Sequence, residues 1–205
     1  MTVSAPRTTW DIGLNAWVIQ DGNYPDFKTG QIAEFALEFW LPSEDIIQAA
    51  NGELSATKVE DCLYDAVADV ILHTSTTTFL DIGILVYQHG SLPLPALQQG
   101  RRVGLRLGLG VDPYFYFECL SQNADVPPLV YSWEVKSILL QTAPFIEVTA
   151  DCGRKMRVRD PARLAYQEIV QTDAWNDDGA YGEYLLRCDL LPIPPKRISA
   201  TANYP

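Results

Sequence analysis

The sequence has few of the residues on which most enzyme active sites depend. It contains two histidines, His73 and His89, and its four cysteines lie far apart, with no Cys-x-x-Cys pair. A Gly-x-Ser-x-Gly elbow, a phosphate-binding loop and a complete dinucleotide-binding loop are also missing. These absences exclude a zinc knuckle, a thioredoxin-like site and the common nucleotide sites. We therefore predict no cofactor and no metal ion, and we favour a non-enzymatic protein over an enzyme.

Long apolar segments are missing as well. No apolar run approaches the ~20 residues that a membrane-spanning helix needs, and the first residues lack the apolar centre of a signal peptide. With no export signal, Cys62, Cys119, Cys152 and Cys188 are expected to be reduced thiols. We predict a cytoplasmic protein that contacts no membrane.

Positive charge is scarce, because 15 Lys and Arg residues stand against 26 Asp and Glu residues, for a net charge of −11. Proteins bind nucleic acids largely by neutralising phosphates with basic side chains, so this balance argues against nucleic acid as a partner. The same charge favours solubility and disfavours anionic membrane surfaces.

The sequence does contain the alternation that is typical of β-strands. Over residues 101–111, apolar side chains alternate with arginines and glycines, which predicts a strand with one buried face. Pro113 ends this strand because proline has no N–H to donate. The polar face carries three glycines, which are expected to allow the strong bend that a small barrel needs: Gly104, Gly108 and Gly110.

Similar patterns predict more strands and a few helices. Further strands are expected over residues 12–20, 31–41, 129–140 and 183–190. Helix-start signals at Ser43 and at Asp160-Pro161 predict two short helices, over residues 43–52 and 160–171.

The segment 57–73 fits two patterns, because its apolar residues match both helical spacing and alternation. A helix would stack Asp61, Asp65 and Asp69 on one side, where like charges repel. We therefore favour a β-hairpin over residues 64–88.

This distribution predicts an all-β fold, either a partly open β-barrel of OB-like type or a β-sandwich, with one or two short helices. We expect a flexible tail over residues 1–9 and a single β-rich domain over 10–191, with a sub-boundary near 42–60. The Pro-rich tail over 192–205 is expected to be extended.

Aromatic and basic side chains supply the candidate contacts to a ligand or partner. If the aromatic run 114–117 forms a strand, its two tyrosines share one face, on which a ligand can stack. Burial of the run in the core is the alternative interpretation. The polar loop 173–182 carries two more aromatic residues, and two arginines lie on the glycine-rich strand. The candidate residues are Tyr114, Tyr116, Trp175, Tyr181, Arg102 and Arg106.

Three other groups carry further hypotheses. The basic residues of segment 154–159 would form an anion site if they met the arginines of the glycine-rich strand, although pairing with carboxylates is the alternative. The acidic residues between Glu60 and Asp81 do not have the spacing of a known metal-ligand set. A His89–Cys152 pair would combine a base with a nucleophile, but no motif supports it.

We predict a protein-interaction module with a protein partner, and a homodimer stays open because edge strands can pair between chains. Two alternatives remain. One is an OB-like barrel that binds nucleic acid or an oligosaccharide through an aromatic face, and the other is a hydrolase of unknown substrate.

Overall fold

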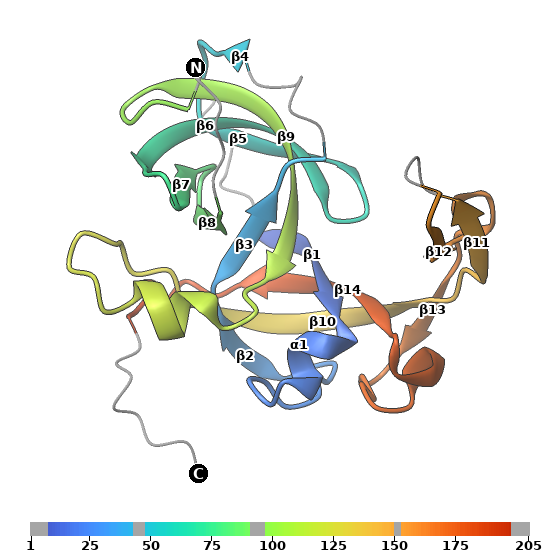
Figure 1. The fold of residues 1–205 in the computed structure, drawn as a ribbon. Coiled ribbons are helices and arrows are strands. Elements are labelled where there is room, and N and C mark those ends of the chain that lie inside the picture. The colour runs from blue at the N-terminus through green and yellow to red at the C-terminus, as the bar shows by residue number, and fades with distance from the viewer. Residues whose placement is uncertain (1–7, 43–47, 91–96, 150–152, 198–205) are drawn as a thin grey trace.

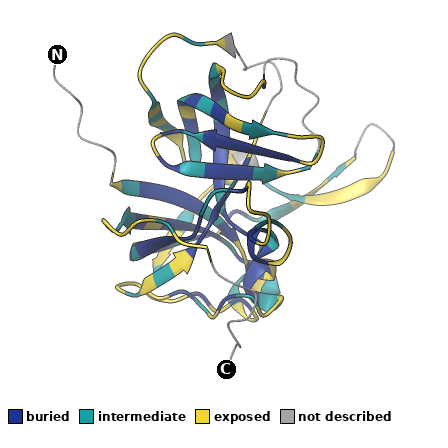
Figure 2. Ribbon diagram, turned by 90° about the vertical axis from the view of Figure 1, so that its left-hand side faces the viewer, coloured by how far each residue is buried: buried dark blue, intermediate teal, exposed yellow. Residues whose placement is uncertain are grey.

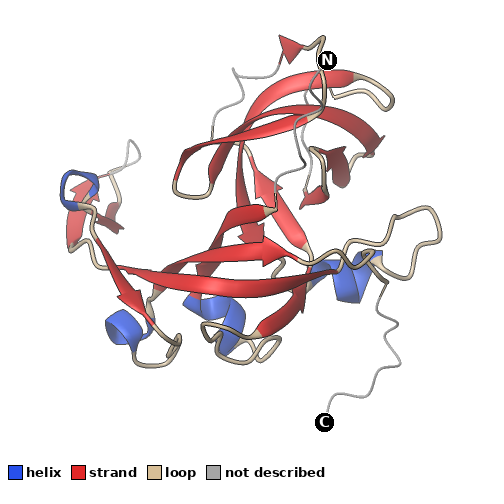
Figure 3. Cartoon of the chain, turned by 180° about the vertical axis from the view of Figure 1, so that it is seen from behind, coloured by secondary structure: helices blue, strands red, loops and turns tan. Residues whose placement is uncertain are grey.

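The computed structural model describes residues 8–42, 48–90, 97–149 and 153–197. Strands account for 52% of the chain and helices for 10%, which confirms the all-β prediction (Figure 3). The fold consists of a closed five-stranded barrel with extra strands. In Figure 1 the barrel occupies the upper part and most of the extra strands form a sheet below it.

The five barrel strands are β3 (Leu37–Trp40), β6 (Leu63–His73), β7 (Thr77–Asp81), β8 (Leu85–His89) and β9 (Arg102–Val111). The barrel closes through β9, which pairs with strands on both of its sides. Around the ring the order is β6, β7, β8, β3, β9 and back to β6, and only the β3–β8 pair is parallel. Two short strands extend the ring, β5 (Ser55–Glu60) on β6 and β4 (Gln48–Ala49) on β9.

The strands of the lower sheet are β1 (Thr9–Asn15), β2 (Ile32–Phe35), β10 (Tyr131–Gln141), β13 (Tyr166–Ile169) and β14 (Glu183–Leu190). The sheet is built around β10, which pairs with β14, β13 and β2, while β1 pairs with β14. A separate hairpin of two strands, β11 (Phe145–Thr149) and β12 (Lys155–Arg159), projects to one side (Figure 1).

Barrel and sheet share one hydrophobic core, whose buried residues come from both ends of the chain. Figure 2 shows the buried segments running along the strands of both parts. Strand β9 joins the two parts, because it pairs with β6 and β3 in the barrel and meets β1 of the sheet at the pair Gly13–Gly110. This junction positions the candidate functional site.

A buried carboxylate helps to fix the barrel on the sheet. Asp11 of β1 accepts from Lys58 Nζ of β5 at 2.6 Å and from Arg187 Nε of β14 at 2.9 Å. Burial raises the pKa of Asp11, but the two cations have the larger combined effect and hold this pKa below its ordinary value. The Tyr64 hydroxyl from β6 also accepts from the backbone N–H of Asp11, at 2.7 Å. The relative placement of the two parts is therefore supported by hydrogen bonds as well as by the core.

Several sequence predictions are confirmed. The glycine-rich strand, the strand near 129–140 and the strand over 183–190 are present as β9, β10 and β14. The ambiguous segment 57–73 is strand throughout, except for the turn between β5 and β6. The strand expected over 31–41 is divided into β2 and β3 at Ala36.

Other predictions are wrong. The strand expected over 12–20 ends at Asn15, and the short helix α1 (Ala16–Gln20) follows it. The helix expected over 160–171 is a single 3₁₀ turn (Pro161–Arg163), after which β13 pairs with β10, because tertiary pairing overrides a local helix signal. For the aromatic run 114–117, the interpretation as a strand with a ligand-stacking face is wrong, since Tyr114 has a positive φ of 74° and a π-helical turn (Tyr116–Leu120) follows. The other interpretation, burial in the core, holds for Tyr114, Tyr116 and Phe117.

The remaining sequence predictions concern the tails and the first helix. Residues 1–7, 43–47 and 198–205 lie outside the described residues, and Gln48–Ala49, where the first helix was expected, is strand β4. In the described part of the C-terminal tail, Lys196 forms an isolated bridge with Val130. No helix among the described residues is long and apolar enough to cross a membrane.

Candidate functional site

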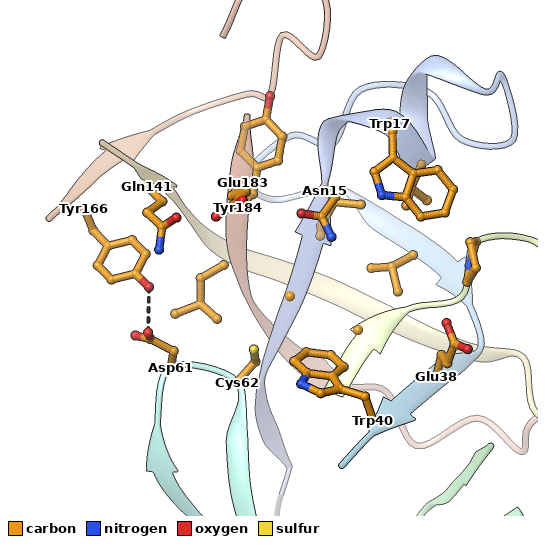
Figure 4. Close-up of a pocket in the computed structure, with 17 residues that line it drawn as sticks. Asn15, Trp17, Glu38, Trp40, Asp61, Cys62, Gln141, Tyr166, Glu183 and Tyr184 are labelled. Carbon is orange, nitrogen blue, oxygen red and sulfur yellow. Dashed lines mark hydrogen bonds between the residues drawn. The ribbon is translucent and has the colours of Figure 1, made fainter. Parts of the chain in front are cut away.

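A cavity of about 400 Å³ lies where the barrel meets the sheet, and we call it the junction cavity. Its walls come from β1, α1, β3, the turn between β5 and β6, β9, β10, β13 and β14. The polar and aromatic residues that line it are Asn15, Trp17, Glu38, Trp40, Asp61, Cys62, Gln141, Tyr166, Glu183 and Tyr184 (Figure 4). In this view the two tryptophans and Glu38 lie on one side, and Asp61, Tyr166 and Gln141 lie across from them.

The Trp40 indole can occupy its position in the cavity wall only because the residues packed against it are glycines. A Cβ atom at Gly108 would lie 2.2 Å from indole atoms Cε2 and Cζ2, and one at Gly110 would lie 3.3 Å from Cζ3. A Cβ at Gly13 on β1 would lie 3.6 Å from Cη2 of the same ring. The glycines of β9 therefore leave room for an aromatic ring against the strand, in addition to any bend they permit.

We expect Gly108→Ala to displace the Trp40 ring, because an alanine Cβ cannot occupy the same space as the indole. In ¹H–¹⁵N spectra the Trp40 indole signal should shift more than those of the other four tryptophans. Gly104→Ala is the matched control on the same strand, since its Cβ would meet only Ala50 Cβ, at an ordinary 3.7 Å. Equal spectral changes in both variants would contradict the packing described here.

The polar side of the cavity is organised by Asp61, which adopts a positive φ of 40° in the turn between β5 and β6. The Tyr166 hydroxyl donates to Asp61 Oδ2 at 2.7 Å. Burial and this hydrogen bond raise the pKa of Tyr166, so the phenol keeps its proton and acts as a donor. The barrel turn is thereby joined to strand β13 of the sheet across the cavity.

Two other groups in the cavity are poorly solvated. Burial, together with the neighbouring Asp61, raises the pKa of the Cys62 thiol to about 11, so this thiol is neutral and a poor nucleophile. Burial also raises the pKa of Glu38, which accepts a backbone hydrogen bond from His89. The cavity thus holds one carboxyl group whose charge is costly unless a ligand compensates it.

A shallower groove of about 340 Å³ adjoins the cavity and shares Asn15, Trp17 and Glu183 with it. Phe145 and Tyr181, whose ring centroids are 6.4 Å apart, also line this groove. Cavity and groove together form a continuous surface with Trp17 between them.

The six residues predicted from the sequence do not form one site. Tyr114 and Tyr116 are buried, with Tyr116 fully so, and the Tyr116 hydroxyl donates to the backbone oxygen of Pro127 at 2.9 Å. Tyr181 is 70% exposed and lines the adjoining groove, whereas the exposed Trp175 lines neither the cavity nor the groove. The structure thus places the two tyrosines of the aromatic run in the core, where they present no surface to a ligand.

The two predicted arginines lie on the barrel and form ion pairs across neighbouring strands. Arg102 donates to both carboxylate oxygens of Asp69, each at 2.7 Å. Arg106 donates to both oxygens of Asp65, at 2.7 and 2.9 Å. The basic segment 154–159 does not join them, because β12 belongs to the separate hairpin. The combined anion site considered from the sequence is therefore not formed.

The other sequence candidates also remain apart. Among the described residues, no group of three or more His, Cys, Asp and Glu side chains is arranged to hold a metal ion. His89 stacks on Phe115, with ring centroids 3.6 Å apart, and does not line the junction cavity. The suggested His89–Cys152 pair involves a residue outside the described part of the chain.

The six contact residues predicted from the sequence include none of the residues that line the junction cavity. One signal was present: Trp40 lies on the opposite side of its strand from Leu37 and Phe39, which are buried. A tryptophan on the polar side of a strand is a candidate contact residue. The position of Trp17 gave no such signal, because the sequence pattern placed it on a strand that is in fact the short helix α1.

Comparison with known proteins assigns no family to the chain. No protein-family model, curated protein or solved structure matches it. The functional conclusions therefore depend on the geometry and chemistry of the junction cavity.

Proposed function

We propose that this chain is a non-enzymatic protein-interaction module whose contact site is the junction cavity with its adjoining groove. The observation that carries this proposal is the exposure of two tryptophans on the walls of one preformed cavity. Trp17 is 52% exposed and Trp40 is 42% exposed, although the other side of Trp40 is packed on glycines. Rigid aromatic anchors beside a pocket are typical of the residues that dominate protein–protein binding energy.

The chemistry of the described nucleophiles and bases supports a binding role. The Cys62 thiol is neutral, His73 Nδ1 is hydrogen-bonded to Thr78 Oγ1 at 2.9 Å, and His89 is stacked on Phe115. We place the protein in the cytoplasm, where free thiols such as those of Cys62 and Cys188 stay reduced. A hydrolase would need a nucleophile beside a base, and neither histidine lines the cavity.

The alternative of a barrel that binds nucleic acid through aromatic residues receives less support. The aromatic run that would have supplied the stacking face is partly or fully buried. The cavity that does expose aromatic rings carries Glu38, Asp61 and Glu183, which would repel phosphates. An uncharged oligosaccharide is not repelled in this way, and the experiment below separates it from a protein partner.

Affinity capture from host lysate tests the proposal, with tagged wild type, the double variant Trp17→Ala/Trp40→Ala, and Trp175→Ala as matched control. Trp175 is 65% exposed but lines neither the cavity nor the groove, so its loss removes a similar surface side chain elsewhere. We expect one stoichiometric protein to be captured by wild type and by the control, with nuclease or glycosidase treatment making no difference, and to be lost from the double variant. Equal capture by all three proteins, or recovery of glycan in place of protein, would overturn the proposal.

A further inference from the structure

The lining of the junction cavity is acidic. Among the described residues that line it, three are carboxylates, Glu38, Asp61 and Glu183, and none is lysine or arginine. Glu183 forms an ion pair with Arg159, whose Nε lies 3.8 Å from Glu183 Oε2, whereas neither Glu38 nor Asp61 has an ion pair among the described residues. By contrast, the carboxylates Asp65 and Asp69 on the barrel are each paired with an arginine through two hydrogen bonds.

The three carboxylates line the cavity from three different elements. Glu38 comes from β3, Asp61 from the turn after β5, and Glu183 from the first residue of β14. Burial raises the pKa of Glu38, and Asp61 already accepts from the Tyr166 hydroxyl at 2.7 Å. A cation placed between them would find acceptors on both sides of the cavity (Figure 4).

The aromatic walls suit the same kind of ligand. Trp17 and Trp40 present indole surfaces to the cavity, and tryptophan is the side chain that attracts a cation most strongly through its ring face. Trp40 is held against β9 by its contacts over Gly108 and Gly110, so its ring is already fixed before a ligand arrives. A planar guanidinium group can stack on such a ring while it donates to a carboxylate, which an ammonium group does less well.

We propose that the junction cavity receives an arginine side chain of the partner protein, stacked on the Trp17 and Trp40 indoles and paired with Glu38 and Asp61. This inference rests on the proposed function and adds the chemistry that the partner must present. The apolar groove formed by Phe145 and Tyr181 continues from Trp17 and takes a neighbouring apolar residue of the same segment. Arginine is also among the residues most enriched at the energetic centres of protein interfaces.

The test is a titration of the full chain with N-acetyl-arginine amide, followed by the indole ¹H–¹⁵N signals. N-acetyl-citrulline amide is the matched neutral probe, because it keeps the shape and most of the donors of arginine but has no charge. We expect the arginine probe to shift the Trp17 and Trp40 signals and to bind at least about tenfold more tightly than citrulline. Binding should weaken as salt is added.

Two sets of variants complete the test. Glu38→Gln and Asp61→Asn should each weaken arginine binding several-fold while leaving the remaining spectrum unchanged, and Trp175→Ala should leave binding unchanged. Equal binding of arginine and citrulline, or the absence of shifts at Trp17 and Trp40, would overturn the arginine inference. If capture of the partner still depended on Trp17 and Trp40, the proposed function would stand and only the identity of the captured side chain would be wrong.

Discussion

Asp112→Asn is expected to stabilise the protein at pH 8 by about 2–4 kcal/mol while changing its stability little at pH 4. Asp112 is fully buried immediately after β9, and burial is the main cause that raises its pKa from 3.8 to about 7. The charge of nearby Glu38 acts in the same direction. Hydrogen bonds from the Tyr87 hydroxyl and from the Tyr116 backbone N–H, at 3.2 Å, partly offset these effects.

The direction in which Asp112 changes stability with pH follows from comparing the pKa of its carboxyl group in the folded and unfolded chains. The folded carboxyl group binds its proton more tightly than the unfolded one, so its contribution to stability is fully present below about pH 4. It is lost as the pH rises from the ordinary value of 3.8 through the folded pKa of about 7. An asparagine stays neutral throughout, and its Oδ1 can still accept from Tyr87 and Tyr116. The variant therefore removes the titration while keeping both hydrogen bonds.

Urea unfolding of the wild type and the variant at pH 4, 6 and 8 measures this difference directly. Other carboxylates can change stability with pH in the opposite direction. Asp11 is one of them: burial raises its pKa, but Arg187 and Lys58 lower it overall. The difference between the two proteins at each pH cancels such contributions. Asp125→Asn, at an exposed position, is the matched control and should follow the wild type. A difference that did not grow with pH would show that Asp112 is ionised in the folded protein at low pH.

The strands that the sequence predicted correctly are those in which burial and alternation coincide. In β9, residues 103, 105, 107, 109 and 111 are buried, so the pattern of side chains directly reports the environment. In β6, Asp65 and Asp69 would repel on a helix, but on a strand they face Arg106 and Arg102 of β9. Their charges therefore favour the strand once the neighbouring strand is present.

The predictions that failed concern segments whose conformation depends on distant residues. The segment after Asp160 has a good helix start, and Asp160 does cap a turn there by accepting from Ala162 N–H at 3.0 Å. Pairing of the following residues with β10 then ends the helix after one turn. A local signal cannot report a partner strand that lies far away in the sequence.

The candidate site could not be predicted from the sequence for the same reason. Its carboxylates and rings come from elements that are distant in the sequence, and no short motif joins Trp17, Trp40, Asp61 and Tyr166. The glycines of β9 were recognised, but their role in seating the Trp40 ring depends on the pairing of β3 with β9. Only the order of strands around the barrel brings these residues together.

The five tryptophans contribute differently to stability, because they differ in burial. We expect Trp133→Ala to cause a large loss in the free energy of unfolding. Trp133 is fully buried on β10, stacks on Phe35 with ring centroids 5.5 Å apart, and donates through Nε1 to the Phe35 backbone oxygen at 3.1 Å. Truncation creates a large cavity and removes that donor, which should cost about 3–5 kcal/mol. For a chain of this size, the melting temperature should fall by roughly 6–20 °C.

Thermal unfolding of Trp133→Ala beside Trp175→Ala checks this expectation, because the two changes are chemically identical but differ in burial. Trp175 is 65% exposed in a loop, so its truncation should change stability by less than about 0.5 kcal/mol. Trp133→Phe separates the two contributions, since phenylalanine keeps the ring on Phe35 but cannot donate a hydrogen bond, and its loss should be intermediate. If Trp133→Ala were as stable as Trp175→Ala, the sheet would not pack around β10 as described. In that event the position of the junction cavity, whose wall includes Gln141 of the same strand, would also be wrong.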